Sequence, residues 1–210
     1  MGCFAAIHDL KIVYAFCKSD KSASVLIVCT ELCTLHFQHE PTMDNIASSL
    51  LFGDGSAAAL VTSDVNANEG FYIDGFHSEI ISKGKRDMAW ELSSTGFQMT
   101  LSGYIPDLIE EDFLGVVNRA LGSNASIDNI SHWCIHPGGK RILEAINKCL
   151  SFSGDELKYS YDILREYGNL SSATILFVLK QIAEQEKPIN KLFAAAFGPG
   201  LTIETFTCHN

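Results

Sequence analysis

The sequence lacks several features that would assign a protein to a class at once. No segment approaches about 20 consecutive apolar residues, so no membrane span is predicted. Lys and Arg number 15 against 25 Asp and Glu, and the resulting net charge of −10 argues against nucleic acid or an anionic membrane as a partner. No basic stretch precedes the first apolar residues, so we expect no signal peptide.

Paired cysteine spacing is also missing. The seven cysteines form an odd set without a regular pattern, which is typical of reduced thiols in the cytosol and predicts a cytoplasmic protein. No low-complexity tract or repeat of about 20–50 residues is visible. What the chain does have is length and apolar content: 210 residues, 47% of them hydrophobic, suffice for one large domain or a domain and a half.

Apolar residues at helical spacing alternate along the chain with continuous apolar runs. Helices are predicted over 3–17, 43–51, 105–121, 140–150, 156–167 and 170–180. Strands are predicted over 24–33, 57–62, 71–81, 87–92, 96–101, 130–136, 191–197 and 201–207. The continuous run at 24–33 predicts a strand buried on both faces, and the helix at 170–180 is apolar nearly all round and should be central. This alternation indicates an α/β layered fold.

Three reactive polar residues stand at the junctions of predicted elements. Cys3 begins the first helix, His136 ends a strand before Pro-Gly-Gly, and Asn169 precedes the small-sided helix. A helix N-terminus favours a thiolate, a nearby imidazole can pair with that thiolate or act as the base that generates it, and an amide can hold an oxyanion. Each residue alone also has an ordinary interpretation as a buried thiol, a structural histidine or a helix cap.

Six short motifs carry a resemblance. They are G-C-F-A-A (2–6), V-C-T-E-L (28–32), L-F-G-D-G-S-A-A (51–58), H-P-G-G (136–139), Y-G-N-L-S-S-A (167–173) and F-G-P-G-L-T-I-E (197–204). In this order they resemble the signatures of type III polyketide synthases, the chalcone- and stilbene-synthase-like members of the thiolase superfamily. H-P-G-G with G-N-L-S-S favours this branch over ketoacyl-synthase III relatives.

The resemblance implies a thiolase-like fold of mixed sheets with buried central helices, and a catalytic role for each junction residue. Cys3 would be the nucleophile that carries the acyl group, and His136 and Asn169 would hold the thioester carbonyl. The same two side chains would stabilise the enolate formed when malonyl-coenzyme A loses carbon dioxide. Attack of this enolate on acyl-Cys3 would extend a coenzyme A-linked starter, without a permanently bound cofactor, and the full-length enzyme would be a homodimer.

The resemblance also implies a substrate cavity and a coenzyme A path. Phe52 matches an aromatic gatekeeper, and Met99 lies where many members carry a second gatekeeper. The remaining cavity positions are Trp90, Cys33, His36, Gly198, Pro199 and Gly200. Pantetheine and phosphates would pass Gly138, Gly139 and Arg141. Ordinary packing is the alternative at Phe52, Trp90, Cys33 and His36, and a solvated helix charge is the alternative at Arg141.

No metal site is expected. His36, His39 and Glu40 lie in a polar loop without a further ligand at useful spacing. Cys29 and Cys33 are four apart in a strand pattern, which suits neither a redox pair nor a zinc knuckle.

The resemblance covers only part of the family's length. Residues 1–70 would be a remnant of the N-terminal thiolase-like half, with a boundary near 63–70, and residues 71–210 would be the C-terminal half. With its first strands missing, the sheet should have an open edge and apolar patches. We therefore predict a poorly soluble chain that is inactive alone or needs the missing half in trans.

Other functions compete with polyketide synthesis. A thiolase-superfamily enzyme that performs a single condensation, as ketoacyl synthases do, shares the same catalytic set. A papain-type protease shares the residue order, but the chain lacks a C-G-S-C-W-like context around Cys3. A non-enzymatic alternative is an inactive truncated remnant, or a partner that binds a full-length synthase.

Overall fold

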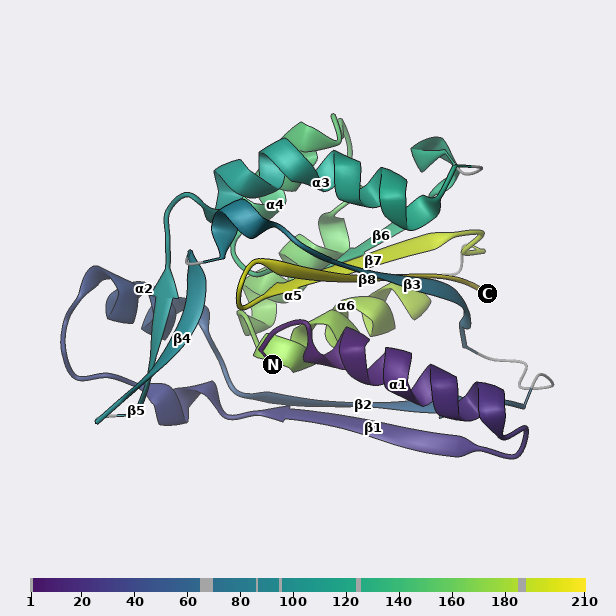
Figure 1. Ribbon diagram of the computed structural model, residues 1–210, viewed down its shortest axis with the longest axis horizontal. Helices are drawn as coiled ribbons and strands as arrows, with labels where there is room; N and C mark the ends of the chain where they lie inside the picture. Colours follow the sequence, from purple (N-terminus) through teal and green to yellow (C-terminus); the bar gives the residue numbers. More distant parts are fainter. Residues whose placement is uncertain (1, 65–69, 86, 95, 124–125, 185–187) are drawn as a thin grey trace.

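The computed structural model describes residues 2–64, 70–85, 87–94, 96–123, 126–184 and 188–210. A mixed four-stranded sheet lies at the centre of the fold (Figure 1). Its strands are, in spatial order, β3 (Tyr72–Ile80), β8 (Thr202–His209), β7 (Leu192–Gly198) and β6 (His132–Ile135). Only β6 and β7 run parallel, and the other neighbours are antiparallel. The layered α/β fold predicted from the sequence is confirmed.

Helices cover both faces of this sheet (Figure 1). On one face lie α3 (Ile105–Leu121) and α4 (Lys140–Cys149), and on the other lie α1 (Ala5–Ser19) and α6 (Thr174–Ala183). Successive β7 side chains point to opposite faces, so Phe193 and Ala195 join the core under α3 and α4, whereas Ala194 and Ala196 join the core under α1 and α6. The helix α5 (Lys158–Tyr167) packs beside β6, α4 and α6.

A two-stranded ribbon forms the next layer. It pairs β1 (Ser24–Glu31) with β2 (Gly55–Thr62), antiparallel, and packs its inner face on α1 and α6. On its outer face Leu26 stands opposite Leu60, with 61% and 69% of their surfaces exposed. The prediction that this run is buried on both faces is wrong, because no described element covers its outer face.

An arm extends from one end of the ribbon (Figure 1). It comprises the short 3-10 helix η1 (Cys33–His36), the helix α2 (Met43–Leu51) and the hairpin of β4 (Met88–Ser93) with β5 (Gly96–Leu101). The helix α2 contains no buried residue, and Met43 and Leu50 are largely exposed. Within the described ranges, no helix is long and apolar enough to cross a bilayer.

Element bounds follow the sequence patterns closely, with two informative shifts. The helices α2 and α3 have the predicted bounds. The first helix begins at Ala5 rather than at residue 3, because Phe4 is its N-cap residue. The run at 170–180 opens with the 3-10 turn η4 (Ser171–Ala173) before α6 begins.

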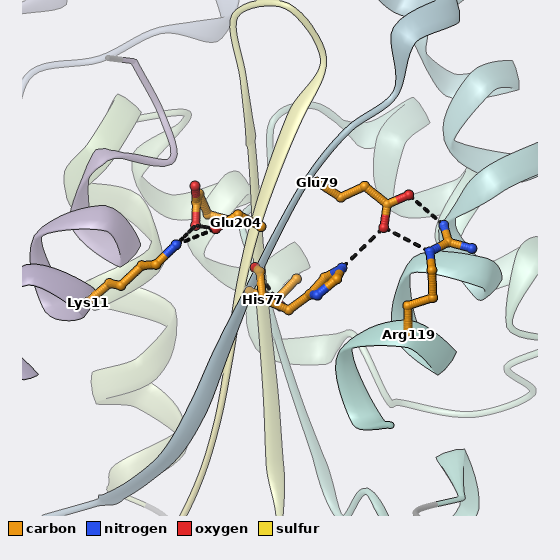
Figure 2. Close-up of polar contacts among 7 residues, drawn as sticks. Lys11, His77, Glu79, Arg119 and Glu204 are labelled. Atoms are coloured by element: carbon orange, nitrogen blue, oxygen red, sulfur yellow. Dashed lines mark hydrogen bonds and ion pairs between the residues drawn. The ribbon is translucent and has the colours of Figure 1, made fainter. Parts of the chain in front are cut away.

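Polar contacts join helices to opposite faces of the sheet (Figure 2). From α1, the Lys11 ammonium lies 3.8 Å from the buried carboxylate of Glu204 and donates to Ser78 Oγ at 2.5 Å. Ser78 in turn donates to Glu204 at 2.6 Å. From α3, the Arg119 guanidinium donates twice to Glu79, at 2.9 and 2.6 Å, and so holds the pKa of that carboxyl below its usual value.

Candidate active site

Cys3 lies on the turn that leads into α1. Gly2 has a φ of +78°, and the Ala5 N–H donates to the Gly2 carbonyl at 2.9 Å. A Cβ on Gly2 would come within 2.9 Å of Pro199 Cδ, so the loop between β7 and β8 approaches closely here. Glycine suits both the positive φ and this close approach. The turn places the Cys3 thiol one residue before the N-cap of the helix.

His136 follows the last residue of β6. Its N–H donates to the Ala195 carbonyl at 2.8 Å, which continues the pairing with β7 by one residue. The side chain is 1% exposed, and neither ring nitrogen has a hydrogen-bond partner among the described residues. A buried polar group without a hydrogen-bond partner costs free energy, so such groups are rare in folded proteins. Those that do occur are often found where a ligand binds.

Asn169 is held by a short parallel bridge to the chain segment after α2. Its N–H donates to the Leu51 carbonyl at 2.9 Å, and its carbonyl accepts from Gly53 N–H at 3.0 Å. Gly168 has a φ of +74°, and a Cβ there would lie 2.9 Å from the Leu51 carbonyl oxygen. A residue with a side chain would therefore force the two segments apart.

The Asn169 amide has a defined orientation. Its Oδ1 accepts hydrogen bonds from Ser171 N–H at 2.9 Å and from Thr174 Oγ1 at 3.4 Å. The Cys3 thiol lies 4.0 Å from the same oxygen. Among the described residues, Asn169 Nδ2 reaches only the Gly138 carbonyl, at a long 3.4 Å. The amide therefore keeps a donor available on the side of Gly138 and His136.

The three candidate catalytic residues meet in one cavity of about 730 Å³. Of the residues predicted to act with them, the structure brings to this cavity Cys33, His36, Phe52, Gly138, Gly198 and Pro199. Gly139, Arg141 and Gly200 are not among its lining residues. Arg141 is exposed on α4, and Gly200 donates its N–H to the Met88 carbonyl at 2.8 Å.

Trp90 and Met99 stand directly opposite each other in the β4–β5 hairpin. Their side chains lie outside the part of the molecule that the structure describes, so their predicted roles as a cavity wall and a gatekeeper stay predictions.

Several lining residues escaped the sequence analysis. They are Glu31, Gln38, Asn45, Ser48, Ser49 and Ser171. Glu31 and Ser171 stand inside motifs that were already quoted, V-C-T-E-L and G-N-L-S-S, and the motifs were signal enough to include them. The polar residues of the arm carried no such signal, because only the fold of η1 and α2 turns them toward the cavity.

Burial dominates the electrostatics of the site. It raises the pKa of the Cys3 thiol to about 11, and the nearby Glu31 carboxylate adds to this rise while the Ser171 hydroxyl opposes it. Burial also lowers the pKa of the His136 imidazole to about 3. Because removal from water disfavours charge on both groups, the resting site at neutral pH holds a neutral thiol and a neutral imidazole.

Two family models match this chain. Residues 75–210 match the model of the chalcone and stilbene synthases, C-terminal domain. Residues 1–84 match that of 3-oxoacyl-[acyl-carrier-protein] synthase III.

The sequences of individual relatives align with nearly the whole chain. A chalcone synthase homologue of Bacillus subtilis is 33% identical over 97% of this chain and 59% of its own length. The 3,5-dihydroxyphenylacetyl-CoA synthase of Amycolatopsis orientalis is 31% identical over 97% of this chain and 56% of its own length. The type III polyketide synthase domain of Steely1 from Dictyostelium superposes with a TM-score of 0.90 at 28% identity, covering 100% of this chain and 60% of that one.

The chain thus spans less than three-fifths of the length of these two curated relatives. The family model nonetheless matches well over half of the chain. This chain therefore belongs to the chalcone and stilbene synthase family, the type III polyketide synthases, which share the thiolase fold.

Proposed function

We propose that this chain provides the active site of an acyltransferase that condenses malonyl-coenzyme A units onto a coenzyme A-linked starter through an acyl-cysteine. One observation carries the proposal: Cys3, His136 and Asn169 come from three distant segments and line a single cavity. A thiol, an imidazole that has no hydrogen-bond partner among the described residues, and an oriented amide donor are the groups that acyl transfer needs.

Loading would begin with proton transfer from the Cys3 thiol to the His136 imidazole. The sulfur then attacks the thioester carbonyl of the starter, and the oxyanion accepts hydrogen bonds from Asn169 Nδ2 and the protonated imidazole. When the carbon–sulfur bond to coenzyme A breaks, the departing thiolate takes the proton back from His136. The free imidazole nitrogens and the weakly bound Nδ2 are consistent with this division of work.

Extension would use the same two donors. Loss of carbon dioxide from malonyl-coenzyme A leaves an enolate, whose oxygen His136 and Asn169 stabilise. The enolate carbon attacks acyl-Cys3, the bond to Cys3 sulfur breaks, and the chain, now two carbons longer, remains on coenzyme A. Return of the chain to Cys3 would allow another round, and ring closure would release an aromatic or pyrone product.

The remaining predicted positions keep, as proposals, the roles that the resemblance implies. Cys33, His36, Phe52, Gly198 and Pro199 line the cavity and would limit the size of the starter and product. Trp90, Met99 and Gly200 are proposed to complete that wall. Gly138, Gly139 and Arg141 are proposed to lie along the path of pantetheine and phosphate.

Further proposals concern the whole enzyme. Residues 1–70 and 71–210 would belong to the two thiolase-like halves, and the full-length enzyme would be a cytoplasmic homodimer without a permanent cofactor.

Acyl loading tests the proposal directly. An acyl-coenzyme A starter should add one acyl group to the intact protein, seen as a covalent mass increase, and Cys3→Ala should abolish it. Cys17→Ala is the matched control, because Cys17 lies on α1, the helix that follows Cys3, and does not line the cavity. Loading that persists in Cys3→Ala but disappears in Cys17→Ala would contradict the assignment.

A second candidate is a single condensation. The match of residues 1–84 to 3-oxoacyl-[acyl-carrier-protein] synthase III favours it. Product mass separates the two functions, since several added two-carbon units indicate polyketide synthesis and one unit indicates a ketoacyl synthase-like enzyme.

A third candidate is a chain that is an inactive remnant alone or serves as the partner of another polypeptide. The exposed outer face of the ribbon, with Leu26, Val28 and Leu60, favours this candidate. Its test is acyl loading by the chain alone and with the separately expressed N-terminal segment of a relative. Loading that needs the added segment would support a partner, and equal loading without it would exclude that requirement.

A further inference from the structure

Ser171 has an unusual backbone. Its φ is +50°, in the left-handed region that residues with a side chain seldom adopt. Ser151 and Leu201 are the other described non-glycine residues with positive φ, and neither lines the cavity, whereas Ser171 does. Such a conformation persists only where its surroundings hold it, and it often occurs at functional sites.

Two hydrogen bonds hold this conformation. The Ser171 N–H donates to Asn169 Oδ1 at 2.9 Å, and the Ser171 carbonyl accepts from Thr174 Oγ1 at 2.8 Å. The residue is 9% exposed, so water does not compete freely for these groups. The same Asn169 amide that we place in the chemistry therefore also orients Ser171.

The strained turn places the Ser171 hydroxyl beside the candidate nucleophile. Ser171 Oγ lies 3.7 Å from Cys3 Sγ, closer than the 4.0 Å from Asn169 Oδ1 to the same sulfur. A hydroxyl can accept a hydrogen bond from a thiol and can rotate to donate one to a thiolate. Asn169 Oδ1 is only an acceptor, so it can bind the thiol but cannot donate to the thiolate.

We propose that Ser171 is a positioning residue for Cys3: its hydroxyl, fixed by the strained turn, accepts the thiol hydrogen bond at rest and donates to the thiolate once the proton has left. The step is a proton transfer from Cys3 to His136 followed by rotation of the Ser171 hydroxyl. The proposal rests on the proposed function only in taking Cys3 as the nucleophile.

The other titratable groups around Cys3 make this donor important. Glu31 at the end of β1 disfavours a negative sulfur, and its carboxylate accepts hydrogen bonds from Ser172 N–H and Oγ. Cys33 and His36 on η1 and His136 after β6 face the same cavity. Among these neighbours the Ser171 hydroxyl has the largest effect that lowers the pKa of Cys3.

The test measures how fast iodoacetamide alkylates Cys3 as a function of pH, with the modified peptide identified by mass spectrometry. Between about pH 7 and pH 10 the rate follows the thiolate fraction of a thiol whose pKa is about 11. Loss of one hydrogen bond to the charged sulfur should slow alkylation in Ser171→Ala roughly three- to tenfold at each pH.

A second variant and a control keep the result interpretable. Ser171→Gly removes the same hydroxyl but suits the positive φ, so it should fold even if Ser171→Ala does not, and should show the same slower alkylation. Ser160→Ala removes a buried hydroxyl that donates to the Ile135 carbonyl at 2.6 Å. This control should lower the melting temperature without moving the Cys3 profile.

Each outcome decides the proposal. Wild-type alkylation rates in Ser171→Gly would overturn it, and so would an equal slowing in Ser160→Ala. Slower alkylation confined to the Ser171 variants would support it. If wild-type protein forms no condensation product while this pattern holds, the proposed function fails and the role of Ser171 stands.

Discussion

Two apolar strands of this molecule have opposite environments. Every residue of β7 is buried, because β7 lies between β8 and β6 and has helices on both faces. In β1, which is also largely apolar, exposed and covered positions alternate. The difference shows that an apolar run indicates only that a strand could be buried on both faces. Whether both faces are in fact buried depends on the elements packed around the strand.

The candidate active-site cavity lies where these two regions meet. His136 extends from β6 in the fully covered sheet, whereas Glu31 is the last residue of β1 in the ribbon. Cys3 precedes α1 and Asn169 precedes α6, and these two helices pack between the four-stranded sheet and the ribbon. The well-covered sheet thus supplies a buried imidazole, and the ribbon and its arm supply much of the polar wall.

Deleting a large side chain in each strand should give the largest contrast. Phe193 on β7 is fully buried and packs against Trp133 with ring centroids 5.3 Å apart. Phe193→Ala should lower the free energy of unfolding by about 3–5 kcal/mol because it leaves a cavity. Leu26→Ala on the outer face of β1 should change it by less than about 0.5 kcal/mol. Urea unfolding measures both, and equal losses would mean that the outer face is covered in solution.

The free energy of unfolding should depend on pH through His136, the buried residue that follows β6. The folded-state pKa of His136 is about 3, below the ordinary value of 6.5, so the unfolded chain takes up a proton first as the pH falls. The contribution of His136 to the free energy of unfolding is therefore fully present above about pH 6.5 and decreases as the pH falls toward 3. Between pH 7 and pH 5 the loss should be about 2 kcal/mol.

Unfolding measured at several pH values tests this linkage. His136→Gln removes the titrating group, so its free energy of unfolding should be flatter over the same interval, whatever its absolute stability. An identical slope in wild type and His136→Gln would show that other groups cause the acid sensitivity.

The smallest expected change in stability concerns the ribbon. Leu26 and Leu60 are opposite each other on its outer face, so Leu26→Lys with Leu60→Glu would place opposite charges across the pair. The free energy of unfolding should change by less than about 0.5 kcal/mol, while self-association should decrease because the apolar patch is broken. Light scattering measures the association. A large loss of stability would instead show that these side chains are packed.

Much of the molecule was predictable from local pattern. The bounds of α2 and α3 followed from apolar spacing, since helix ends depend on nearby residues. The start of α1 shifted because a turn at Gly2 and Phe4 precedes it, which periodicity does not reveal. The outer face of β1 was predicted wrongly, because coverage depends on elements far away in the sequence.

The candidate site also has a part that the sequence predicts and a part that it does not. Cys3, His136 and Asn169 could be selected from residue type and motif, and the fold then placed them around one cavity. The polar wall from η1 and α2 could not be predicted, because it depends on how the arm folds beside Cys3. Ser171 lies close to Cys3 because its backbone has a positive φ, which the pattern of residues does not predict.

The sequence by itself determined the order of helices and strands, the family and the choice of candidate catalytic residues, because these depend on local periodicity and short motifs. Tertiary structure alone decided which strand faces are covered, which side chains meet and how their protons are held. Burial, contact distance and pKa are properties of groups brought together from across the chain, as with Cys3 beside Ser171 and Asn169, and they exist only once the layers are packed.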